Sequence, residues 1–441
     1  MNFYFIVFAA TLSVSLILTY VNSNLARIED AEQRIFQNNY LIVYTLAYFA
    51  DWLKGPYVYA LYESHGMTEQ DIALLFVVGF GVSGLFGPVV GVLADKYGRK
   101  KLSLAYFVIY ILSVLCKPFP NFYILLLGRV LSGIGTSLLT TTFESWMVSE
   151  HNRRQYPLEF LDDTFSKSTL CNSFSAIAAG IVAQLSVEYF GNIAPFLIAL
   201  NPLIIGMYLC TRLWENDSTK ITRTIVSGSI KMDKNMYVLG LSQSLFLGAM
   251  YTFVFLWTPT LDFSNPNVPY GLVFATFMVM ISIGSGIFKL IANWTEKLPF
   301  FIFSLSIFST LVTIVSIENE YVVFLSFLVF ELACGLMFPT YGSLRSTYIP
   351  EEHRTTIMNI YRIPLNLFVV GVLLMKQYMT LKSSFMICLA TYISCISIWY
   401  TFTPNKKIHE GNKYKRTAAS DTSDLDDLES DNELEEWEDI Y

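Results

Sequence analysis

The feature that most constrains this chain is a recurrence of apolar runs, each about as long as a lipid bilayer is thick. A membrane-crossing helix needs roughly 20 mostly apolar residues, and one soluble core could not bury so many such runs. Only 15% of the residues are charged and 54% are hydrophobic, which favours lipid as the surroundings. The thirteen candidate runs are 3–20, 40–62, 70–94, 102–117, 121–147, 164–187, 192–213, 235–257, 269–289, 298–316, 321–344, 356–376 and 383–403.

The last twelve runs divide into two sets of six at a polar segment, so we expect an all-α integral membrane protein. The expected parts are an extra N-terminal helix with its linker (1–38), a six-helix bundle (39–213), a cytosolic loop (214–234), a second six-helix bundle (235–403) and a cytosolic tail (404–441). Residues 421–441 hold eleven acids and no Lys or Arg, so without them the formal charge changes from −7 to +4. Such a tail is expected to be disordered. It is either a solvating tail or a contact for a cytosolic partner.

The placement of Lys and Arg supports this alternating arrangement. With loop 95–101 in the cytosol, the inner segments hold 22 of the 29 Lys and Arg, and the outer segments hold three. This bias is what the positive-inside rule predicts, and it places the N-terminus outside and the C-terminus in the cytosol. No basic residue precedes run 3–20, while Arg27 and Arg34 follow it. We therefore expect a retained helix there and not a cleaved signal peptide.

The sequence GVLADKYGRKK, Gly91–Lys101, follows the second of the twelve core runs. It resembles the signature loop of the major facilitator superfamily. Gly91 permits a close helix approach, Gly98 suits a tight turn, and Asp95 faces a helix N-terminus or pairs with Arg99. Glu144 is expected to contact this loop as a conformational latch.

Five further motifs are similar, in the same order, to the molybdate-anion transporter family, a branch of the major facilitators. They are DWLKGP (Asp51–Pro56), FESW (Phe143–Trp146), FLWTP (Phe255–Pro259), ELACGL followed by FP (Glu331–Pro339) and RIPL (Arg362–Leu365). The resemblance covers roughly residues 39–403, and it includes the extra N-terminal helix; the acidic tail departs from it. It implies a major facilitator fold, two six-helix bundles plus one helix, and uptake of molybdate, a tetrahedral dianion. We expect the plasma membrane as its location, with lipid as its surroundings.

Ionisable residues at membrane depth usually mark a pathway. Away from the ends of the predicted spans, the acids are Asp51, Glu144 and Glu331, and the bases are Lys54, Arg129, Lys167 and Arg362. Asp51 and Lys54 are three apart on one helix face, so they either neutralise each other or serve the substrate. Asp51 and Glu331 are the candidate proton carriers.

Arg129 heads a polar stripe that continues through Ser132, Thr136, Thr140 and Glu144 at helical spacing. Asn359, Arg362 and Asn366 make a similar stripe in the second bundle. Major facilitators bind substrate between their halves, and guanidinium groups match tetrahedral oxygens. The substrate-binding candidates are therefore Arg129, Arg362, Lys54, Asn359 and Thr136. The alternative is that each Arg pairs with an acid such as Glu331.

Motifs of catalysis and metal binding do not occur. The six cysteines form no C-x-x-C pair, and H-E-x-x-H, G-x-S-x-G and a phosphate-binding glycine loop are missing. We expect a transporter working by alternating access, with no enzyme activity, cofactor, metal or nucleic-acid partner. Two alternatives remain: transport of another oxyanion such as sulfate or of an organic anion, and a non-transporting receptor or scaffold that acts through the tail.

Overall fold

The computed structural model describes residues 2–21, 31–215, 232–263, 268–349 and 354–402. Tail 404–441 and most of loop 214–234 lie outside the described residues. The helices are α1 (Asn2–Val21), α2 (Ala31–Lys54), η1 (Gly55–Tyr57), α3 (Val58–Ser64), α4 (Glu69–Tyr97), α5 (Arg99–Leu115), α6 (Phe122–Arg154), α7 (Leu158–Phe190), α8 (Ala194–Leu213), α9 (Lys234–Asp262), α10 (Tyr270–Ile291), η2 (Ala292–Trp294), α11 (Leu298–Val315), α12 (Glu320–Tyr348), α13 (Arg354–Met375), η4 (Lys376–Tyr378) and α14 (Leu381–Trp399). The described part contains no β-strand, and the all-α prediction is confirmed.

Short polar residues fix where several of these helices begin. The Thr68 hydroxyl accepts a hydrogen bond from the Asp71 amide at 3.2 Å, and the Asp71 carboxylate accepts one from the Thr68 amide at 3.1 Å. This reciprocal pair is a capping box at the start of α4. At the starts of α6 and α9, one side-chain oxygen of Asn121 and one of Asp233 accept hydrogen bonds from backbone amides of the first turn.

The run predicted as one helix over 40–62 is in fact broken. Helix α2 begins nine residues earlier, at Ala31, and ends at Lys54, where the short turn η1 leads into α3. Pro56 explains the break, because it has no N–H to donate and its ring clashes with the preceding helical turn. Lys54 therefore lies in the last turn of α2.

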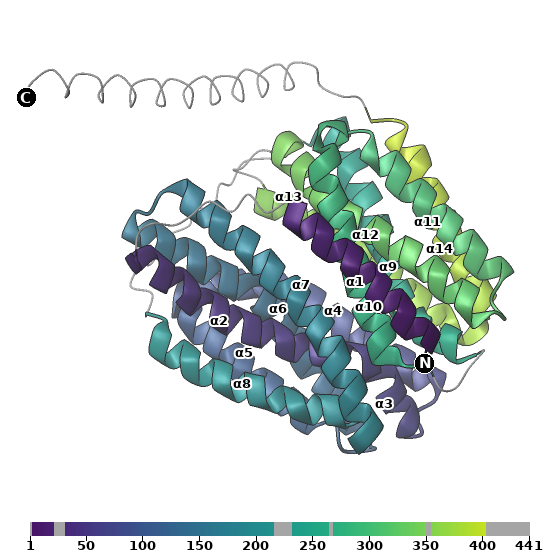
Figure 1. The fold of residues 1–441 in the computed structure, drawn as a ribbon, viewed down its shortest axis with the longest axis horizontal. Helices are drawn as coiled ribbons and strands as arrows, with labels where there is room; N and C mark the ends of the chain where they lie inside the picture. Colours follow the sequence, from purple (N-terminus) through teal and green to yellow (C-terminus); the bar gives the residue numbers. More distant parts are fainter. Residues whose placement is uncertain (1, 22–30, 216–231, 264–267, 350–353, 403–441) are drawn as a thin grey trace, which may run out of the picture.

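The helices form two groups, as Figure 1 shows. In the first half, which is α2 to α8, α6 packs against α4 and α5, and α2 packs against α7 and α8. In the second half, which is α9 to α14, α12 packs against α10 and α11, and α9 packs against α13 and α14. The two halves meet mainly where α4 contacts α13 and where α7 contacts α10.

The contact between α7 and α10 is very close. A Cβ atom built on Gly271 would lie 2.4 Å from the Gly180 carbonyl oxygen and 2.6 Å from the Gln184 amide nitrogen. Any side chain at position 271 would push these backbones apart, so glycine sets the approach of the two halves here.

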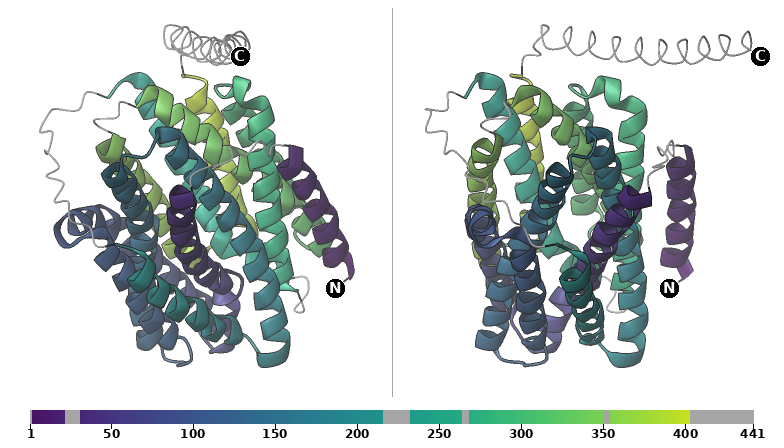
Figure 2. Two further views of the ribbon diagram at one scale, coloured as in Figure 1. Left: turned by 60° about the vertical axis from the view of Figure 1, so that its left-hand side comes forward. Right: turned by 90° about the vertical axis from the view of Figure 1, so that its left-hand side faces the viewer.

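Helix α1 lies outside both groups, alongside the second half (Figure 2). It packs on α10, and the Tyr4 hydroxyl donates to Glu320, the first residue of α12, at 3.4 Å. Farther along α1, the Ser15 hydroxyl lies 3.2 Å from that of Ser282 in α10. Helix α1 therefore begins on the side of the molecule where α12 begins.

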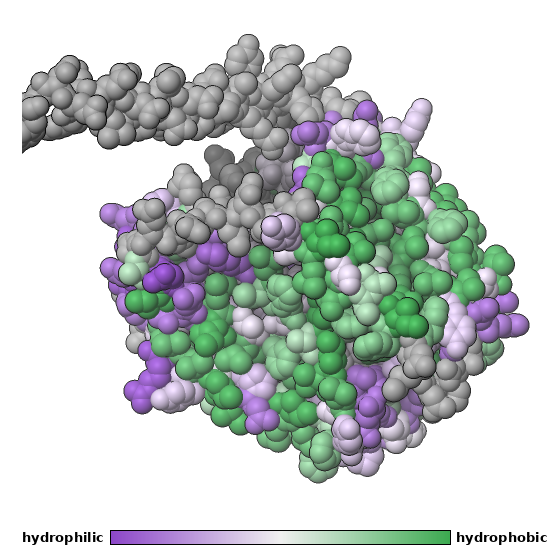
Figure 3. Space-filling view, viewed as in Figure 1, coloured by the Kyte–Doolittle hydropathy of each residue, from purple (hydrophilic) through white to green (hydrophobic). Residues whose placement is uncertain are grey.

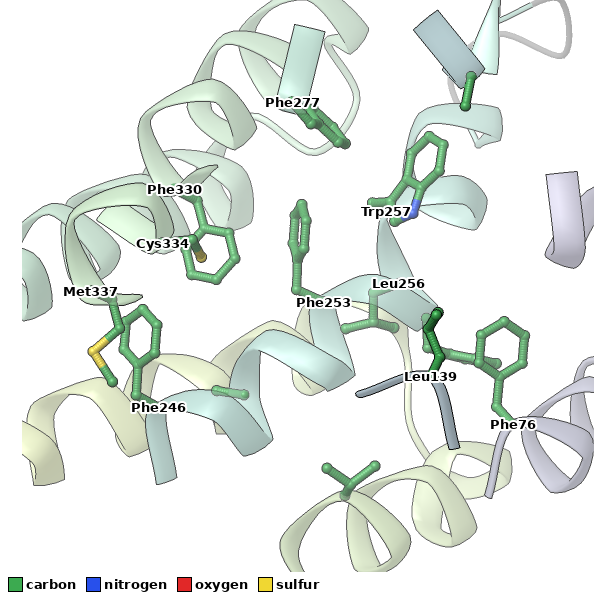
Figure 4. Close-up of a cluster of buried hydrophobic side chains, with 14 of the residues drawn as sticks. Phe76, Leu139, Phe246, Phe253, Leu256, Trp257, Phe277, Phe330, Cys334 and Met337 are labelled. Atoms are coloured by element: carbon green, nitrogen blue, oxygen red, sulfur yellow. The ribbon is translucent and has the colours of Figure 1, made fainter. Parts of the chain in front are cut away.

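Ten of the described helices are long and apolar enough to cross a membrane, judged by length and composition. Hydrophobic side chains cover much of the face seen in Figure 3, with polar groups gathered towards its edges. Beneath them, aromatic rings of α9, α10 and α12 pack together, among them Phe253, Phe277 and Phe330 (Figure 4). Phe76 of the first half lies next to this cluster, so the apolar core is continuous between the halves.

Candidate functional site

Lys54 and Asp51 belong to a polar network that joins three helices. The Lys54 Nζ atom lies 3.3 Å from Asp51 Oδ1 and 3.3 Å from the centre of the Tyr110 ring. The Tyr110 hydroxyl hydrogen-bonds to Asp51 and lies 3.3 Å from the Thr136 hydroxyl. The network thus connects α2 to α6 through a tyrosine of α5, which sequence reasoning did not single out.

Arg129 of α6 lies between two aromatic rings. Its Cζ atom is 4.3 Å from the centre of the Phe76 ring in α4 and 5.2 Å from that of Tyr62 in α3. The Nε and Nη2 atoms are buried and have no hydrogen-bond partner within the part of the chain that the structure describes. Unpaired charged donors are costly to bury. Their presence here is typical of a site that a ligand completes.

Lys54 and Arg129 are close enough to interact electrostatically, and the hydroxyl of Tyr62 interacts with the guanidinium group. We call Asp51, Lys54, Tyr62, Tyr110 and Arg129 the cation cluster. Sequence reasoning selected its charged members, but not its tyrosines. The spacing of an isolated tyrosine carries no signal of which helix it will face.

The polar stripe of α6 runs from Arg129 towards the signature loop. The hydroxyls of Ser132 and Thr136 donate back to carbonyl oxygens of their own helix, at 3.0 and 2.9 Å. Thr140 and Glu144 are exposed, although they lie on the apolar segment predicted to span the membrane. Glu144 is near enough to Tyr44 and Tyr48 of α2 to interact with them electrostatically.

Arg362 of α13 does not join the cation cluster. A Cβ atom built on Gly87 would lie 2.3 Å from Arg362 Nη1, whereas the side chain of Arg129 lies against Gly79. Those two glycines are eight residues apart on α4, so the arginines are roughly 12 Å apart along that helix. Asn366 lies between them, against Gly84. The side chain of Asn359 lies outside the described residues.

Ion pairing does not account for either arginine among the residues that the structure places. The salt bridges found there include neither Arg129 nor Arg362. Glu331 is on α12 and only 7% exposed. Lys167, by contrast, pairs with Asp163 at 2.7 Å.

The signature loop joins α4 to α5 through Gly98, whose φ of 95° suits glycine. Arg99 is buried, and its Nη1 donates to the Ser149 hydroxyl in α6 at 2.7 Å. Lys100 donates to the carbonyl oxygen of Trp214 at 2.5 Å. The loop therefore ties α5 to α6 and to the end of α8. Gly91 has open space beside it, and the side chain of Asp95 lies outside the described residues.

We call the end of the molecule near Glu69, where α4 begins, the gate side, and the end near Gly98 the loop side. On the gate side, aromatic residues of the two halves meet: Phe76 with Phe255, Phe80 with Tyr251, and Trp52 with Phe274, with ring centres 5.0–5.8 Å apart. Closer to the surface, Glu69 forms an ion pair with Lys376. The halves are therefore closed against each other on the gate side.

A cavity of about 370 Å³ lies beside that ion pair, between the halves. Burial, and the neighbouring carboxylates of Asp262 and Glu69, raise the pKa of Glu63 at its rim. Its lining comprises Tyr59, Glu63, Met67, Glu69, Ile72, Pro259, Asp262, Phe263, Lys376, Met379, Thr380 and Leu381.

Comparison with known proteins supports the same fold. A bacterial homologue of the iron transporter ferroportin, solved in an inward-facing state, superposes with a TM-score of 0.68 at 13% identity, covering 84% of this chain and 99% of the other. A family described as sugar transporters with 12 transmembrane segments matches residues 3–333. The fold is that of the major facilitators, a class of membrane transporters.

Curated relatives define the branch. The molybdate-anion transporter of Xenopus tropicalis is 33% identical over 396 residues, covering 84% of this chain and 87% of the relative. That of Takifugu rubripes is 34% identical over 378 residues, covering 76% and 78%. The chain belongs to the molybdate-anion transporter family of the major facilitators.

Proposed function

We propose that this protein carries molybdate across a membrane by alternating access, and that the cation cluster is its anion site. The observation that carries the proposal is the Arg129 guanidinium, with two buried nitrogens unpaired among the described residues. The substrate is the one that the names of the curated relatives give for those proteins. The process involves binding and release, with no covalent step.

The chemistry of the cluster suits a tetrahedral oxyanion. The planar fork of a guanidinium presents parallel donors that match two oxygens of such an anion. Lys54, 8% exposed at the break of α2, adds a compact charge with freely rotating donors. Tyr110 and Thr136 add hydroxyls beside it.

Arg362 and Asn366 extend the site towards the second half. They lie on α13 where it meets α4, roughly 12 Å from Arg129 along α4. In this conformation they are too distant to share one anion with Arg129. We assign them to the exit path on the loop side, or to a conformation in which the halves have moved.

The contacts between the halves support a state that is closed on the gate side. We propose that the α4–α13 and α7–α10 contacts change when the halves move during transport. We assign the loop side to the cytosol and the gate side to the outside of the plasma membrane, because Lys and Arg concentrate on the loop side. Since α1 begins where α12 begins, on the gate side, the N-terminus lies outside in this assignment.

Coupling to a cation would make uptake favourable. Each negative charge that enters against an inside-negative potential costs about 2.3 kcal/mol per 100 mV, so a dianion costs roughly twice that. Asp51 touches Lys54 and Tyr110 in the cluster itself, and Glu331 is buried in the second half. We propose these two carboxyls as the proton carriers.

Uptake of molybdate into a depleted host, followed by elemental mass detection, tests the function. We expect the wild-type protein to raise uptake, sulfate to compete, and Arg129→Ala to lose uptake at unchanged surface level. Lys382→Met, an exposed lysine of α14, is the matched control. Wild-type protein that reaches the surface and moves no molybdate would overturn the proposal.

A further inference from the structure

Lys117 is a buried lysine in the segment between α5 and α6. The residue is only 3% exposed, although it lies outside both helices. The Nζ atom donates to the Tyr62 hydroxyl at 2.5 Å and lies 4.9 Å from the centre of the Tyr62 ring. Its carbonyl oxygen lies 2.9 Å from His65 Nε2, which anchors the backbone. The side chain is thus directed into the first half.

Two cationic side chains lie over the ring of Tyr62. Arg129 lies 5.2 Å from the centre of the same ring that Lys117 contacts, and Tyr62 is fully buried. A tyrosine ring attracts one cation through its π-face. Two cations on one buried ring also repel each other, and that repulsion must be offset by negative charge.

The described residues supply little negative charge there. Lys117 and Arg129 are in none of the salt bridges found among them. Lys54 interacts electrostatically with both, and it has Asp51 as its partner. With both lysines protonated, three cations and one carboxylate carry a formal charge of +2. Burial and the neighbouring Arg129 lower the pKa of Lys117, so its protonated form requires an anion beside it.

Burying uncompensated charge is unfavourable, and such groups are ordinarily paired. An incoming dianion would cancel the +2 completely, whereas a monoanion of the same shape would cancel half of it. The cluster can therefore discriminate between ligands by their charge as well as by their shape.

We propose that Lys117, held by the Tyr62 hydroxyl, is the third cation of the anion site and makes it selective for doubly charged tetrahedral anions. The inference rests on the proposed function, because it refines the same site. Lys117 adds the positive charge that favours a doubly charged ligand, while Arg129 donates the directed hydrogen bonds.

Molybdate and perrhenate provide the test, because both are tetrahedral oxyanions of similar size and they differ by one charge. The quantity measured is the ratio of their apparent affinities in uptake assays on intact protein. For Lys117→Met we expect molybdate affinity to fall roughly ten- to a hundredfold, with perrhenate affinity changed much less. The matched control is Lys382→Met, an exposed lysine on α14, which should leave the ratio unchanged.

Tyr62→Phe is the second variant, and it decides the matter if Lys117→Met fails to reach the surface. It keeps the ring and removes the hydroxyl that holds Nζ, so the ratio should shift in the same direction by less. Lys117→Arg keeps the charge and should preserve the preference for molybdate. Equal losses for both anions, or an unchanged ratio, would overturn the role of Lys117. A wild-type protein that moves neither anion would overturn the proposed function itself.

Discussion

Glu69, the first residue of α4, forms an ion pair with Lys376, which directly follows α13, with 2.5 Å between Oε1 and Nζ. The pair connects the two halves at the gate side. Lys376 is only 5% exposed, while about half of the Glu69 side chain is accessible. The Glu69–Lys376 ion pair is therefore intermediate in strength between an exposed and a buried ion pair.

Breaking this pair should open the gate side. In Lys376→Gln, the lost attraction should increase labelling of a cysteine placed at Ile72, a buried residue in the lining of the gate-side cavity, severalfold with a membrane-impermeant maleimide. The double variant Glu69→Lys with Lys376→Glu restores opposite charges and should return labelling towards the wild-type rate. Equal labelling in the single and double variants would show that the pair does not hold the gate.

Arg129 and Arg362 should differ in their effects on binding. Arg129→Ala removes charge-assisted hydrogen bonds worth about 1.5–3 kcal/mol each, so affinity for molybdate should fall roughly ten- to a hundredfold. Arg129→Lys should recover part of it, since charge remains while the fork is lost. Arg362→Ala should slow turnover with a smaller change in affinity, because Arg362 lies against Gly87 and apart from the cluster. Binding measured on purified protein, beside uptake rates, separates the two effects; a greater affinity loss for Arg362→Ala would relocate the site.

Gly271→Ala should disfavour the gate-closed state. The added methyl group would meet backbone atoms of α7 at 2.4 and 2.6 Å, and backbone cannot move aside as a side-chain end can. Uptake should fall severalfold while folded yield is retained. Gly81→Ala, on a helix of the other contact between the halves, is the control, because nothing lies within 4 Å of its Cβ position. Normal uptake by Gly271→Ala would mean that this approach is not needed for the cycle.

The two chain ends should lie on opposite sides of the membrane, and the acidic tail should be dispensable for transport. Epitope tags at each end, probed with protease in sealed vesicles, report the sidedness. Both tags on one side would contradict the assignment of α1 as an extra crossing. Deleting 417–441 should leave uptake nearly unchanged at equal surface level, since these residues follow α14, the last helix in the part of the chain that the structure describes.

The sequence by itself determined the membrane class and the family. The lipid bilayer requires each crossing helix to be apolar and about 20 residues long. Length and apolarity are local properties of the sequence, so they can be recognised without knowing which helix packs beside it. The signature loop Gly91–Lys101 and the family motifs are local too, and the curated relatives confirm the branch that they indicated. The break after Lys54 was missed, although Pro56 was its visible signal.

Only the tertiary structure decided which charges lie together. Lys54, Lys117 and Arg129 come from the end of α2, the segment between α5 and α6, and α6 itself, and they converge because those elements pack around Tyr62 and Tyr110. Helical spacing predicted the stripe on α6, but it could not place Lys117, which lies outside the helices, between α5 and α6. Periodicity gives the face of a helix, whereas the neighbour of that face depends on how the helices pack. For that reason Arg129 and Arg362, similar in sequence context, occupy different places in the structure.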